Sequence, residues 1–192
     1  MVINAHPEGK HKYSPGDVQA VKRLLADSSR KLADLTASMV YDNPALLKLL
    51  IEVSWLDEDP WSQRASRVVS ICCCRFPELF QPHCSTIISR LKKVHAESVI
   101  RNFLKILAEI PVTLKDRNKT VLLNLCFDYL SGNYAIAIKV YSMQILFNLS
   151  LEIPEIGVEL CHILEESLPD ASPGYRSRGE KILRKLRRIN FR

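Results

Sequence analysis

Six cysteines and five histidines are the residues of this 192-residue chain that most suggest metal chemistry. Three of the cysteines, Cys72 to Cys74, are consecutive, and Cys84 and Cys161 each adjoin a histidine. A structural zinc site needs thiolates that converge tetrahedrally, whereas adjacent residues of a helix point about 100° apart. We therefore interpret these cysteines as small apolar core residues, and we expect no metal, no other cofactor and no catalytic residue.

A second candidate site is a cluster of aromatic and acidic residues in one short connection. It consists of Trp55, Asp57, Asp59 and Trp61. The aromatic rings could stack on a base or a sugar, and an ionised carboxylate could stabilise a cationic nucleobase. We favour a structural interpretation, in which Asp59 caps the helix that follows Pro60 and the tryptophans fill a groove between helices.

The formal net charge of +6 is concentrated at one end of the chain. Ile182, Leu186 and Ile189 recur there at helical spacing among basic residues, which is typical of an amphipathic helix. We interpret this helix first as a cap that closes the domain, second as a contact for nucleic-acid phosphates and third as a contact for an anionic membrane. The candidate phosphate-binding residues are Arg176, Arg178, Lys181, Arg184, Lys185, Arg187 and Arg188.

The elements that must position these residues are predicted to be helices. Prolines that directly follow Ser14, Asn43 and Asp59 indicate helix starts, and Phe76-Pro77 ends the third of these helices. No segment shows the alternation of a strand, and the short connections favour antiparallel helical hairpins. Further helices are expected at 78–93, 96–110, 116–131, 134–150, 154–167 and 174–189. We expect a flexible N-terminal arm over residues 1–14 and a single domain over residues 15–192.

The predicted hairpins repeat along the chain. Basic residues lie early in the first helix of each pair, at steps of 37, 38 and 39 residues: Arg64, Arg101, Lys139 and Arg178. A period of this length is typical of helical repeat proteins.

This pattern resembles HEAT-like repeats. The segments that carry the resemblance are Asp59-Pro60 with Arg64-Ala65, then Ile100-Arg101 and Ile138-Lys139, which resemble the family's Val-Arg/Lys step, and the match covers about 43–189. The resemblance, which extends to small bacterial HEAT-repeat proteins, implies an all-α, right-handed α-α superhelix of stacked antiparallel helical hairpins. Alkylpurine DNA glycosylases also resemble this architecture, and they place aromatic residues and a carboxylate on a basic concave surface.

A stack of hairpins exposes a continuous surface built from its second helices. The polar residues expected there carry both signs of charge, which fits a protein partner better than a polyanion. We therefore predict a non-enzymatic protein-interaction module, and the reduced cysteines and the lack of a secretory or membrane-spanning segment favour the cytoplasm. The alternative is a nucleic-acid-binding protein, such as a divergent HEAT-like DNA alkylation repair protein. The candidate partner-binding residues are Arg90, Lys93, Asn124, Asp128, Tyr129, His162 and Glu166.

Overall fold

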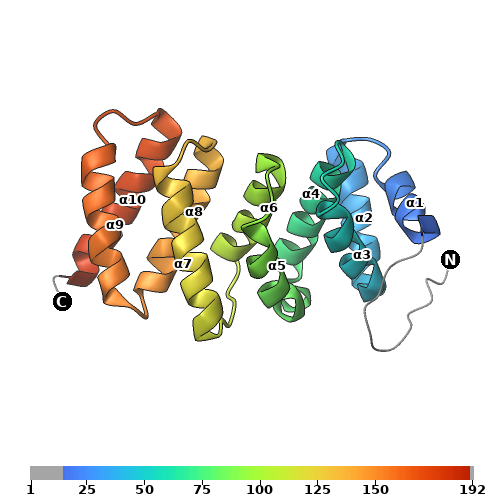
Figure 1. The fold of residues 1–192 in the computed structure, drawn as a ribbon, viewed down its shortest axis with the longest axis horizontal. Coiled ribbons are helices and arrows are strands. Elements are labelled where there is room, and N and C mark those ends of the chain that lie inside the picture. Colours follow the sequence, from blue (N-terminus) through green and yellow to red (C-terminus); the bar gives the residue numbers. More distant parts are fainter. Residues whose placement is uncertain (1–14, 191–192) are drawn as a thin grey trace. The chain divides into compact units, whose positions relative to one another are not determined.

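The computed structural model describes residues 15–190, and this part of the chain contains ten α-helices and no strand (Figure 1). The all-α prediction is therefore confirmed, while the arm predicted over residues 1–14 lies outside the described residues. The helices are α1 (Pro15–Leu24), α2 (Arg30–Asp42), α3 (Pro44–Ser54), α4 (Trp61–Arg75), α5 (Cys84–Leu91), α6 (Glu97–Glu109), α7 (Asp116–Ser131), α8 (Ile136–Ser150), α9 (Pro154–Ser167) and α10 (Pro173–Asn190).

Contacts between Cα atoms group the chain into two compact units. Within the described residues, unit 1 holds 15–84 and 93–106, and unit 2 holds 85–92 and 107–190. The single domain expected over residues 15–192 stays a prediction.

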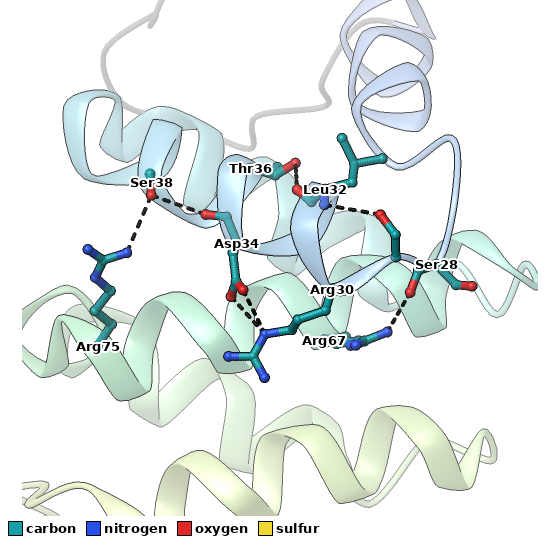
Figure 2. Close-up of polar contacts among 9 residues, drawn as sticks. Ser28, Arg30, Leu32, Asp34, Thr36, Ser38, Arg67 and Arg75 are labelled. Atoms are coloured by element: carbon teal, nitrogen blue, oxygen red, sulfur yellow. Dashed lines mark hydrogen bonds and ion pairs between the residues drawn. The ribbon is translucent and has the colours of Figure 1, made fainter.

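Unit 1 is built around the packing of α2 and α3 on α4. The sequence analysis did not place α2, which begins after Ser29 because the Ser29 hydroxyl accepts a 3.1 Å hydrogen bond from the backbone N–H of Leu32. From α4, the Arg67 guanidinium donates to the carbonyl of Ser28 at 2.8 Å, and Arg75 donates to the Ser38 hydroxyl at 3.4 Å (Figure 2). These bonds join the connection before α2, and the C-terminal half of α2, to α4.

The core of unit 1 is apolar apart from a few hydrogen-bonded side chains. Leu47, Leu49 and Leu50 of α3 are fully buried, as Phe103 of α6 is. Asn102 of α6 is also buried, and its side-chain amide donates to the hydroxyl of Ser66 on α4 at 2.9 Å. The polar pair is tolerated in the core because each group is satisfied by the other.

Unit 2 is organised around α8, which α7, α9 and α10 contact (Figure 1). Coverage by three helices explains why Ile138, Met143 and Leu146, on different sides of α8, are all buried. α10 approaches α9 closely at Gly179, where an added Cβ would lie 2.7 Å from Leu168 Cδ2.

Two local predictions are wrong. The helix expected over 78–93 is replaced by two short 3-10 helices, η1 (Pro77–Leu79) and η2 (Gln81–His83), followed by α5. Prolines lack the N–H that an α-helix needs in its interior, so Pro82 delays the start of the helix. Asp59 is not the cap of α4, because α4 begins at Trp61 and Pro60 occupies the N-cap position.

Candidate partner-binding site

A groove of about 580 Å³ lies in unit 2, where the ends of α7 and α9 meet the starts of α8 and α10. Leu130, Ile136 and Ile163 give it an apolar lining. The other residues that line it are mainly polar: Ser131, Tyr134, Lys139, Glu166, Ser167, Ser172 and Tyr175, together with Ala171. A concave surface that combines apolar side chains with polar groups can bind a ligand, because the polar groups fix its orientation.

Two tyrosines of the groove lining, Tyr134 and Tyr175, are held in place by contacts with neighbouring side chains. The ring of Tyr134 lies edge-on to the buried ring of Tyr129, with centroids 4.9 Å apart. Gly132 leaves room for this arrangement, because a Cβ there would lie 2.8 Å from Tyr134 Cε2 and 2.9 Å from the carbonyl oxygen of Asp128. On the opposite wall, the hydroxyls of Tyr175 and Ser167 are 2.9 Å apart and share a hydrogen bond.

Three polar groups of the groove have no protein partner among residues 15–190. The half-buried Lys139 and the exposed Glu166 form no ion pair there, although both line the groove. The Ser172 hydroxyl is buried and makes no hydrogen bond within the same residues. A buried hydroxyl without a partner is costly, so a ligand that supplies one is favoured.

The candidate partner-binding residues are distributed over three helices of unit 2 and one connection. Asn124 and Asp128 are exposed on α7, and His162 and Glu166 are exposed on α9, whereas Arg90 on α5 is only half exposed. Among them, Glu166 alone lines the groove.

Two of the candidate partner-binding residues are not placed as predicted. Tyr129 is only 4% exposed, its hydroxyl donates to the carbonyl of Leu91 at 3.4 Å, and burial raises its pKa. It is a core residue, because its aromatic ring favours burial more than its hydroxyl favours solvent. Lys93 is exposed, but it follows the end of α5 at Leu91 and so lies in a connection instead of on a second helix.

The predicted basic helix is α10, and it packs on α8 and α9. Arg176 donates to the carbonyls of Leu168, Pro169 and Ala171 at 3.3, 2.8 and 3.3 Å, which caps the end of α9. Arg178 donates to the side chain of Gln144 on α8 at 3.1 Å. These two residues therefore have structural contacts within unit 2.

The remaining basic residues of α10 differ in what they contact. Arg187 pairs with Glu165 at 2.7 Å, and the Lys185 ammonium lies 5.1 Å from the centre of the Phe147 ring. Lys181, Arg184 and Arg188 are exposed. The apolar stripe is shorter than predicted, because Ile189 is 46% exposed while Ile182 and Leu186 are buried.

The aromatic and acidic cluster lies in unit 1, and its two tryptophans have different neighbours. Trp55 stacks on Phe103, with ring centroids 4.4 Å apart and planes 18° from parallel. The Arg64 guanidinium lies 5.6 Å from the centre of the Trp61 ring. Asp57 and Asp59 are exposed. Protein side chains therefore occupy one face of each ring that a nucleobase would use.

The cysteines are free thiols, and Cys72, Cys73, Cys84 and Cys126 are buried. Burial raises the pKa of Cys72 and of Cys84 to about 11. Within residues 15–190, no three or more His, Cys, Asp or Glu side chains are grouped as a metal site would require.

Comparison with known families places the chain in one of them. A family model described as a HEAT repeat domain matches residues 20–186. The chain belongs to this HEAT repeat family. No curated protein and no solved structure matches it.

The basic residue that recurs early in the first helix of each pair makes different contacts in different HEAT repeats. Arg64 donates to the carbonyls of Leu25 and Ala26 at 2.8 and 2.7 Å, so in unit 1 it caps the end of α1. Lys139, at the corresponding place in α8, lines the groove instead. The sequence analysis found this lysine as a repeat marker but did not predict its place in a site.

Tyr134, Ser172 and Tyr175 are among the other groove residues that sequence reasoning did not assign to a site. The signal that could have found the two tyrosines is a glycine one or two residues before each of them: Gly132 at the end of α7 and Gly174 in the first turn of α10. Among the described helices of this HEAT repeat chain, none combines the length and apolar character that crossing a bilayer demands.

Proposed function

We propose that this HEAT repeat chain is a non-enzymatic scaffold that binds a peptide segment of a protein partner in the groove between α7, α8, α9 and α10. The observation that carries the proposal is the groove itself, in which Lys139 and Glu166 lie on an apolar lining without ion partners among the described residues. HEAT repeats commonly act as protein-interaction scaffolds, which supports the same conclusion.

The chemistry of the groove fits a peptide. A partner side chain that is apolar would cover Leu130, Ile136 and Ile163, and its burial would supply most of the binding free energy. The Ser172 hydroxyl offers a hydrogen bond to a peptide group. Lys139 and Glu166 would pair with an acidic and a basic residue of the partner, which gives orientation more than affinity.

Site-specific photo-crosslinking tests this function. A photoreactive phenylalanine at position 136, where Ile136 is 47% exposed and lines the groove, is compared with the same residue at position 35, where Leu35 is 59% exposed on α2 of unit 1. We expect a protein adduct at position 136 only, and we expect K139E and E166K to remove it. Equal adducts at the two positions, or no protein adduct at either, would contradict the proposal.

Binding of nucleic acid through α10 makes a different prediction. A fluorescent DNA duplex would bind the chain with an affinity that falls steeply as salt rises, and R184E would weaken the binding while E166K would not. If the duplex binds in this way and position 136 captures no protein, the nucleic-acid function replaces the scaffold.

A further inference from the structure

The helices α9 and α10 of unit 2 carry two exposed stripes of opposite charge with the same spacing. The acidic stripe of α9 consists of Glu155, Glu159, His162 and Glu166, and every member is exposed. The basic stripe of α10 consists of Ser177, Lys181, Arg184 and Arg188, and every member is exposed. Both sets follow the pattern i, i+4, i+7, i+11, which lies along one face of a helix.

The stripes point away from the core because the opposite faces of both helices are buried. Ile156, Leu160 and Leu164 are the buried side of α9, and Ile182 and Leu186 belong to the buried side of α10. The stripes are therefore the faces that packing within unit 2 leaves open.

The charges of the two stripes are not neutralised within unit 2. Glu155, Glu159, Lys181 and Arg188 form no ion pair or hydrogen bond with the side chains that the structure describes. Glu165 and Arg187, on the flanks of the same two helices, do pair with each other. Pairing between α9 and α10 of one chain thus uses the flanks and leaves the stripes unpaired.

We propose that a second copy of this chain covers these faces, with the acidic stripe of one copy against the basic stripe of the other. The matching spacing allows charges to meet at successive turns, because positions four apart on a helix are separated by about 6 Å along its axis. A complementary patch favours association with a partner of opposite charge and excludes one of like charge.

Exposed apolar residues beside the stripes would add to this contact. Val158 on α9 is 49% exposed, and Ile189 on α10 is 46% exposed. Their burial between copies supplies a favourable contribution that does not depend on salt. A second copy fits better than an unrelated basic peptide because this chain itself carries a basic face of the required spacing.

The self-association is separate from the proposed groove. Only Glu166 belongs both to the acidic stripe and to the groove lining, so Glu155, Glu159, Lys181 and Arg184 are the positions to change. Substitutions there test the contact between copies and leave the lining of the groove intact. The two proposals can therefore fail independently.

Sedimentation velocity of the full chain at low and high salt is the first measurement. At about 0.05 M salt we expect species of at least twice the monomer mass, and at about 1 M salt we expect the monomer to dominate, because the Debye length falls to about 3 Å. The double variants E155K/E159K and K181E/R184E should each associate at least about tenfold more weakly than the wild type. A matched double reversal in unit 1, D42K/E78K, should have no such effect.

Mixing the two double variants is the decisive step. E155K/E159K presents two basic faces and K181E/R184E presents two acidic faces, so each repels itself but complements the other. We expect the equimolar mixture to recover the mass that neither variant shows alone, with helical circular dichroism unchanged in both. A wild-type chain that is monomeric at low salt would overturn the proposal. A mixture that stays monomeric, or a basic stripe that instead binds a DNA duplex as a monomer, would also overturn it.

Discussion

The side-chain amide of Asn102 donates a 2.9 Å hydrogen bond to the hydroxyl of Ser66, and both residues are buried. The bond joins α6 to α4 inside unit 1 across 36 residues of sequence. Ser66 in turn donates to the carbonyl of Gln63 at 3.0 Å. Removing one member of such a pair leaves a buried polar group without a partner, which costs more than the bond itself contributes.

The first prediction concerns this pair. S66A should lower the free energy of unfolding by about 1–3 kcal/mol, because it leaves the Asn102 amide buried with an unpaired donor. The double variant S66A/N102L should lose less than the sum of the two single variants, since it removes both polar groups. Urea unfolding measures all three, and additive losses would show that the pair is not coupled.

The second prediction concerns Gly132, which ends α7 beside the groove. G132A should lower the free energy of unfolding by about 1–3 kcal/mol, because the new Cβ would press on Tyr134 and on the carbonyl of Asp128. It should also weaken capture of a partner at position 136, since Tyr134 forms part of the groove wall. N133A, at an exposed neighbouring position outside the groove lining, is the control, and equal behaviour of the two variants would contradict the packing argument.

The third prediction separates structural arginines from exposed ones on α10. R176A removes the bonds to Leu168, Pro169 and Ala171, so it should destabilise the chain by about 1 kcal/mol in thermal or urea unfolding. R188A removes an exposed side chain and should change stability by less than about 0.5 kcal/mol. If the two variants lose the same stability, Arg176 does not act as a cap.

The fourth prediction is a dependence of stability on pH at His83. Burial, and then the nearby charge of Lys48, lower the pKa of His83, while Glu52 opposes this effect. The unfolded chain therefore takes up a proton more readily, so the free energy of unfolding should decrease as the pH falls below the ordinary histidine value of about 6.5. H83Q should show a smaller decrease in urea unfolding measured across that range. Parallel curves for the two proteins would exclude this role.

The fifth prediction concerns thiol reactivity. Because burial raises the pKa of Cys72 and of Cys84 to about 11, neither carries much thiolate at neutral pH. A disulfide reagent should therefore label the half-buried Cys74 and Cys161 of the native chain first and reach the buried thiols only after unfolding. Mass spectrometry of peptides identifies the labelled sites. Rapid native labelling of Cys72 would show that its surroundings open readily.

The sequence predicted most helices well because their starts carry a strong local signal. Pro44 and Pro154 each begin a helix close to the expected residue, and the apolar residues behind them are buried. The helix α2 was missed because exposed apolar residues blur its pattern. Leu35 is 59% exposed and Met39 is 42% exposed, so hydrophobicity and burial do not coincide there.

The site was harder to predict because it depends on which connections meet. Tyr134 and Ser172 are 38 positions apart and neither belongs to an expected binding pattern, yet both line the groove. Glu166 was predicted correctly as an exposed residue of a second helix, while Tyr129 on α7 was not. The spacing of apolar residues gives the direction of the buried face of a helix only approximately. An aromatic residue near the edge of that face can therefore be predicted as either buried or exposed.

Two of the polar contacts between helices join residues about forty positions apart in the sequence. Arg64 reaches back 39 residues to Leu25 within unit 1, and in unit 2 the side chain of Asn148 reaches back 40 residues to the carbonyl of Ala108. Contacts of this kind close loops of about forty residues, which costs less entropy than joining the two ends of a chain of this length. During synthesis, each hairpin needs little more than the forty residues that precede it, so a nascent chain can begin to fold well before its last helix leaves the ribosome.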